Sequence, residues 1–171
     1  MKKLFLLWSL TTSLGAYTQI LKIENTRPDT ANVYKLDSIG TKGILICNNW
    51  KFAYGDSPKF ASPTFDDSAW KKISIDAEFD QFPSIDKQTV GWFRKKIFVD
   101  SAMLNKPLVF VINIKGAAQI FLNNEKIIDI GKFPKRKAKA KLEFYEELTP
   151  HAFMFKKVGE QTLAIRFIFT H

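Results

Sequence analysis

The chain has 171 residues, of which 46 % are hydrophobic, and a formal net charge of +9, which suits one core in one domain of ordinary size. Its single cysteine excludes an internal disulfide, and its two histidines, one of them the last residue, support neither a catalytic triad nor a histidine metal cluster. We therefore expect a basic, non-catalytic domain that is stable without disulfides.

The first 18 residues have the pattern of a secretory signal peptide. Lys2 and Lys3 give a cationic start, an apolar stretch follows, and Gly15-Ala16 supply the small residues at its end. The apolar stretch is shorter than the roughly 20 residues that a membrane-spanning helix needs. Cleavage is expected after Ala16 or Thr18, which predicts an exported, periplasmic or extracellular protein. The alternatives are an N-terminal membrane anchor and a buried helix.

The rest of the chain divides into two parts. Residues 19–43 are expected to form an N-terminal extension or an edge strand, with a polar loop at 24–32. Residues 44–171 are expected to form the main domain. It opens with the apolar run 44–47, in which Cys47 is expected to be a small buried hydrophobe.

Short apolar runs separated by turn residues predict β structure throughout the main domain. The expected strands are residues 50–54, 72–75, 92–99, 108–114, 118–122, 125–130, 141–144 and 162–169. Asn123-Asn124 fits a tight primed turn, because Asn tolerates positive φ, and Gly159 supplies the turn before the last strand. Asp66 to Trp70 is expected to form a single helical turn. About eight short strands without repeats or βαβ alternation predict an all-β fold, a β-sandwich.

Five motifs follow one another in an order that resembles a known family. They are Trp50-Lys51-Phe52 with Gly55-Asp56, Phe65-Asp66-Asp67-Ser68-Ala69-Trp70, Gly91-Trp92-Phe93-Arg94-Lys95, Gly116-Ala117-Ala118-Gln119-Ile120-Phe121-Leu122-Asn123 and Leu163-Ala164-Ile165-Arg166. Together they resemble the galactose-binding-domain-like jelly roll over about residues 50–169. That fold occurs as the N-terminal sugar-binding-type domain of family 2 glycoside hydrolases and in exported sensor regions of bacterial signalling proteins.

The resemblance implies a jelly-roll β-sandwich and a non-catalytic role. The hairpin departs from the family, because Asn123-Asn124 stands where the glycosidases have Asn-Gly. The catalytic barrel of the glycosidases, with its two acidic residues, has no counterpart in these 171 residues, so the resemblance implies no hydrolysis. The signalling relatives place such a domain before membrane and output modules, so any membrane contact is expected only through a further C-terminal part.

Six residues are candidates for contacts to a carbohydrate or an anionic ligand. They are Tyr54, Asp56, Phe60, Phe82, Trp92 and Arg94. Indole rings can stack on sugars, but Trp50, Trp70 and Trp92 lie in or beside strands, which favours the core. For Arg94 the simpler alternative is a structural ion pair. For Asp66 and Asp67 a turn role is simpler than a Ca²⁺ site, which takes six to eight ligands.

The sequence thus predicts an extracytoplasmic recognition or sensing module, the input end of a larger protein, whose partner is a carbohydrate or an adjacent protein domain. Two alternatives stay open: an accessory domain of a glycoside hydrolase, and a structural domain without a ligand. No cofactor, metal or nucleic acid is expected. The basic stretch 132–141 is interpreted as a solvated loop, although such a run can also bind anionic surfaces.

Overall fold

A computed structural model describes residues 5–9, 32–41, 43–75, 90–112, 116–133 and 150–169, with the backbone alone at 5–9 and 169. Strands make up most of this part of the chain, and the only helices described in it are two short 3₁₀ helices, η1 (Pro58–Ala61) and η3 (Ser101–Met103). The expected all-β fold is confirmed.

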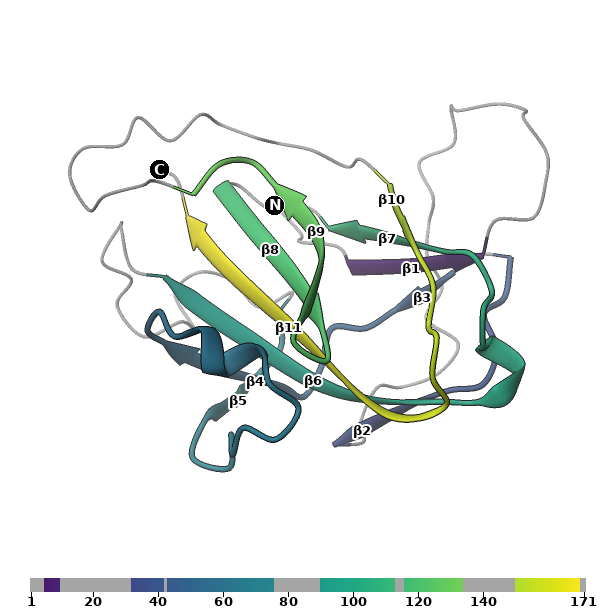
Figure 1. Ribbon diagram of the computed structural model, residues 1–171, viewed down its shortest axis with the longest axis horizontal. Helices are drawn as coiled ribbons and strands as arrows, with labels where there is room; N and C mark the ends of the chain where they lie inside the picture. Colours follow the sequence, from purple (N-terminus) through teal and green to yellow (C-terminus); the bar gives the residue numbers. More distant parts are fainter. Residues whose placement is uncertain are drawn as a thin grey trace.

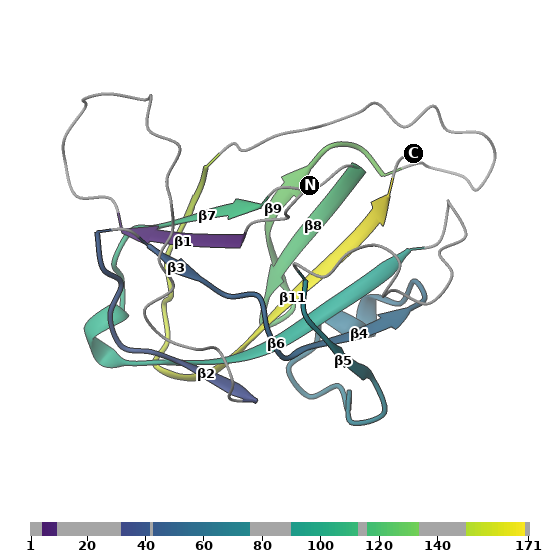
Figure 2. The same ribbon diagram turned by 180° about the vertical axis from the view of Figure 1, so that it is seen from behind.

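Eleven strands form two sheets in the described residues, which Figures 1 and 2 show as separate layers. The smaller sheet has the order β10 (His151–Phe153), β7 (Leu108–Ile112), β1 (Phe5–Ser9) and β3 (Ile44–Leu45). The larger sheet has the order β5 (Lys71–Ile73), β4 (Trp50–Tyr54), β6 (Gly91–Val99), β11 (Gly159–Phe169), β8 (Gly116–Leu122) and β9 (Glu125–Ile130). β2 (Val33–Leu36) runs parallel to β6, and the other pairs are antiparallel.

The core lies between the two sheets, because one cluster of buried side chains draws on both. Leu108, Phe110 and Ile112 come from the smaller sheet, whereas Phe93 and Phe167 come from the larger one. The rings of Phe93 and Phe167 stack with centroids 4.7 Å apart. Such interdigitation of inward-facing side chains is what closes a β-sandwich.

Alternation along β6 separates the two faces of the larger sheet. Phe93, Ile97 and Val99 point into the core, and so Trp92, Arg94, Lys96 and Phe98, which have the opposite parity, point to the outer face. Gly91 is the first residue of β6, and the ring of Phe167 packs against it. A Cβ atom at this position would lie 2.5 Å from that ring. The close packing of β6 against β11 therefore requires glycine here.

Most of the strands expected from the sequence are confirmed, with altered ends. β11 begins at Gly159 rather than 162, and β5 covers 71–73 rather than 72–75. The expected strand at 141–144 lies outside the described residues. The helical turn expected at 66–70 is wrong: Ser68 N–H donates to the Asp66 carboxylate and Trp70 N–H donates to the Asp67 carbonyl, which close two turns instead.

Candidate functional site

The outer face of β6 is covered by residues 55–70, the segment that includes η1 (Figure 1). Beneath it lies Arg94, whose side chain is 1 % exposed. Burying a guanidinium costs free energy unless its N–H groups are hydrogen-bonded, so the partners of Arg94 indicate its role.

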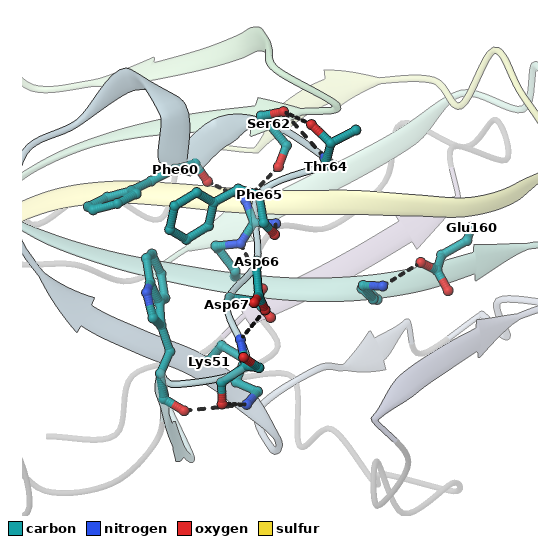
Figure 3. A network of polar contacts seen from close by, with 12 residues as sticks. Lys51, Phe60, Ser62, Thr64, Phe65, Asp66, Asp67 and Glu160 are labelled. Carbon is teal, nitrogen blue, oxygen red and sulfur yellow. Dashed lines mark hydrogen bonds and ion pairs between the residues drawn. The ribbon is translucent and has the colours of Figure 1, made fainter.

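All three guanidinium nitrogens of Arg94 donate hydrogen bonds to the covering segment. Nε donates to Asp67 Oδ2 at 2.7 Å, Nη1 donates to the carbonyls of Phe60 and Ser62, the latter at 3.0 Å, and Nη2 donates to the carbonyl of Phe65 at 3.4 Å. Figure 3 shows these carbonyls and the Asp67 carboxylate converging on one side chain. We call this arrangement the Arg94 knot. It joins two of the recognised motifs, 65–70 and 91–95, to each other.

A second cation holds the same segment from β4. Lys51 Nζ donates to the carbonyls of Ser68 and Trp70 at 3.2 and 3.4 Å (Figure 3). The Asp66 carboxylate accepts hydrogen bonds from the backbone and side chain of Ser68, and these lower the pKa of Asp66. Asp66 and Asp67 therefore serve the turn and the knot.

Aromatic rings fill the space between the covering segment and the sheet. Phe60 meets Trp70 and Trp92 edge-on at 4.9 and 5.8 Å between centroids, and Trp92 stacks on Phe121 at 5.5 Å. The guanidinium of Arg94 lies 5.4 Å from the ring centroid of Phe65. Trp92 is 1 % exposed, and its Nε1–H is buried without an acceptor in the part of the chain that the structure describes.

Beside the knot, a row of ion pairs and hydrogen bonds crosses the outer face from the end of β4 to β9. Arg166 donates from Nε and Nη2 to the two oxygens of Asp56, both at 2.7 Å, and from Nη1 to Gln119 at 2.8 Å. Gln119 donates to Asp129, which also pairs with Lys126. Burial raises the pKa of Asp129, but the hydrogen bonds from Lys126 and Gln119 outweigh it, so that the pKa is lowered.

The six candidates from the sequence are placed as follows. Phe60, Trp92 and Arg94 lie together in or beside the knot, where Trp92 and Arg94 are buried. Asp56 is half-exposed and engaged by Arg166. Tyr54 packs edge-on against Phe52 at 4.8 Å, and burial raises its pKa. Phe82 lies outside the described residues. Arg94 forms an ion pair with Asp67, which is the simpler alternative that the sequence offered for it.

A groove of about 420 Å³ lies elsewhere, between the β8–β9 hairpin and the segment around β10. Lys126, Lys156 and Lys157 line it together with Phe153 and Met154. This groove could not be predicted from the sequence, because its walls come from segments about 30 residues apart in the chain that meet only when the two sheets face each other.

Among the described residues, no group of His, Cys, Asp and Glu side chains could hold a metal ion. The same part of the chain contains no helix with the length and apolar character to cross a bilayer.

No protein-family model and no curated protein sequence matches the chain. Solved structures do match. A Bacteroides uniformis β-glucuronidase superposes with a TM-score of 0.52 at 21 % identity, covering 74 % of this chain and 14 % of its own. A glycosyl hydrolase family 2 member from Bacteroides cellulosilyticus gives 0.52 at 18 %, covering 72 % and 17 %.

A calcium-binding mutant of B. uniformis β-glucuronidase 2 gives a TM-score of 0.51 at 21 % identity, covering 71 % of this chain and 14 % of its own. The chain thus spans less than a fifth of the length of these glycosidases. At such identities the similarity concerns the fold: the chain has the all-β fold of one part of a family 2 glycoside hydrolase.

Proposed function

We propose that the chain is a non-catalytic accessory β-sandwich of a longer, exported glycoside hydrolase of the family 2 type. The observation that carries the proposal is the fold match, which takes in most of this chain but only 14 % to 17 % of each glycosidase. An accessory domain is the kind of unit that produces such unequal coverage. We further propose that the sandwich is a galactose-binding-domain-like jelly roll.

The site geometry supports a non-catalytic role. Asp67 is paired with a buried arginine, and Asp56 is held by both Nε and Nη2 of Arg166. These contacts hold both carboxylates in place, Asp67 through one hydrogen bond from Arg94 and Asp56 through a bidentate pair with Arg166. Both carboxylates therefore have a structural task.

The sensing role expected from the sequence stays a prediction, since the solved structures that support the fold come from glycosidases. The two roles differ in what the gene encodes after codon 171. We expect the reading frame to continue into a further sandwich and a barrel that carries paired acidic residues. A stop codon at that point, or membrane and kinase segments after it, would contradict the proposal, and the latter would favour the sensor.

A further inference from the structure

The groove between the two sheets lies at one edge of each. Among the strands that the structure describes, β9 stands at the end of the larger sheet and β10 at the end of the smaller one. One wall of the groove is the β8–β9 hairpin, and the other is β10 with the residues that follow it. Its volume of about 420 Å³ falls in the range of about 300–1,000 Å³ that is usual for small-molecule sites.

Hydrogen bonds hold the hairpin wall in place. Asn123 bonds to the Gln161 side chain through Nδ2 and accepts from Thr162 N–H at 2.9 Å through Oδ1. Gln161 in turn donates to the Val158 carbonyl at 3.3 Å. The tip of the hairpin is therefore tied to β11 and to the loop before it. A wall fixed before binding spares a ligand the entropy cost of ordering it.

The groove carries an excess of positive charge. Lys126, Lys156 and Lys157 line it against a single acid, Glu125, which leaves a net charge of +2. Lys126 forms an ion pair with Asp129. Lys156 and Lys157 are exposed and have no ion pair within the ranges that the structure describes.

Protection of a sheet edge does not explain these two lysines. Lysines placed on an edge strand discourage pairing with other chains. β10 ends at Phe153, however, and Lys156 and Lys157 lie in the loop that follows it. Their charges therefore lie beside the groove and not along the hydrogen-bonding edge of β10.

The floor of the groove is apolar. Leu122, Ile127 and Phe153 pack against the core and are only partly buried by it, while Met154 is 44 % exposed at the rim. An occupant that fits must combine negative charge with an apolar face in a small volume. A sugar ring that bears a carboxylate has this combination, since one face of the ring is formed by C–H groups.

We propose that this groove binds an acidic oligosaccharide, with Lys156 and Lys157 pairing with its carboxylates and Phe153 and Met154 contacting its ring faces. The choice of a carbohydrate rests on the proposed accessory role, whereas the charge and the apolar floor stand independently of it. An acidic protein segment fits less well, because a specific protein interface buries about 800 Å² on each partner and this groove is a short concavity.

The test is a titration of the 171-residue chain with trigalacturonic acid, followed by amide chemical shifts. We expect saturable shifts at residues 122–127 and 152–157, and none with neutral maltotriose. The double variant Lys156→Glu, Lys157→Glu should weaken binding at least about tenfold, because two attractive contacts become repulsive. The control Lys71→Glu, Lys106→Glu changes the net charge equally at exposed sites outside the groove and should stay within about twofold.

Four results would overturn the proposal. They are no binding of trigalacturonic acid, equal binding of maltotriose, an equal loss in the control variant, and equal affinity for a short polyglutamate at the same amides. The last would assign the groove to an acidic protein segment. Because the accessory role is tested by the reading frame, either proposal can fail without the other.

Discussion

At the scale of single residues, the two most deeply buried tryptophans differ in one hydrogen bond. Trp50 is fully buried and donates from Nε1 to the Ile46 carbonyl at 3.1 Å. Trp92 is just as buried, yet its Nε1–H has no acceptor in the described part of the chain. A buried donor without a partner costs about 1–3 kcal/mol. The two side chains should therefore respond differently to the same substitution.

We expect Trp92→Phe to be tolerated better than Trp50→Phe. The first change removes an unpaired donor together with part of a ring, whereas the second leaves the Ile46 carbonyl without its donor. The free energy of unfolding should be lower in Trp50→Phe than in Trp92→Phe by about 2 kcal/mol. Urea unfolding of the two variants measures this difference. Equal losses would mean that Trp92 Nε1 has an acceptor in solution.

Asp129 provides a test of the electrostatics on the outer face. Its folded-state pKa is lowered, so it adds stability above the unfolded carboxyl pKa of about 3.9 and loses this contribution as the pH falls through the folded value. Lys126→Met removes one of the two hydrogen bonds that lower the pKa.

We expect Lys126→Met to raise the pKa of Asp129, measured from its side-chain carbon shift during an acid titration. The acid loss of stability should then begin at a higher pH. Lys71→Met, on the far edge of the same sheet, is the control and should leave the pKa of Asp129 unchanged. An unmoved pKa in Lys126→Met would show that this ion pair does not form in solution.

At the scale of elements, the β8–β9 hairpin shows how far a local sequence can specify structure. Asn123 and Asn124 have φ of 48° and 75°, as the primed turn predicted from the sequence requires, and that prediction is confirmed. The other non-glycine residues described at positive φ, Asn49 and Asn105, are also asparagines. The left-handed conformation costs other L-residues about 1–2 kcal/mol.

Substitutions of Asn124 should follow this cost. Asn124→Gly is expected to stabilise the domain by about 0.5 kcal/mol, because glycine adopts positive φ without strain, and Asn124→Ala to destabilise it by about 1 kcal/mol. Thermal unfolding of the two variants measures which of them is more stable. An alanine variant as stable as the glycine variant would contradict the turn assignment.

The strand β1 lies within the predicted signal peptide. Residues 5–9 pair with all five residues of β7 and with both residues of β3, so β1 joins the two strands in the smaller sheet. Export with cleavage after Ala16 or Thr18 stays a prediction. If it occurs, the mature chain loses this strand and β7 loses its partner on that side.

Removal of residues 1–18 should therefore expose the edge of β7. We expect the amides of residues 108–112 that face β1 to exchange with solvent faster in the shortened chain, and the urea midpoint to fall, because buried backbone groups lose their hydrogen bonds. Amide exchange of both chains is the measurement. Unchanged protection in the shortened chain would mean that β1 is dispensable or that another segment takes its place.

At the scale of the whole molecule, the sequence predicted the strands but not the sheets. Short apolar runs and turn residues located β4, β6, β7 and the hairpin, because these signals are local. The parallel pairing of β2 with β6 and the position of β10 at a sheet edge depend on contacts between distant segments, for which the chain carries no short-range signal.

The candidate site shows the same limit. The motifs 65–70 and 91–95 were recognisable separately, but the Arg94–Asp67 pair that joins them is visible only in three dimensions. Phe60, Trp92 and Arg94 have the residue types of a sugar site, and the structure places them in or beside the knot that holds the fold. The residues that make the chain recognisable thus stabilise the sandwich, and the proposed recognition site lies at the groove.

Unfolding of Arg94→Met and Lys96→Met tests this central claim most directly. Both side chains lie on the outer face of β6, but Arg94 is buried and donates four hydrogen bonds, whereas Lys96 forms an exposed pair with Glu160 at 2.8 Å. We expect the free energy of unfolding to fall by about 3 kcal/mol in Arg94→Met and by less than about 1 kcal/mol in Lys96→Met. Equally small losses in both variants would contradict the structural role of the knot.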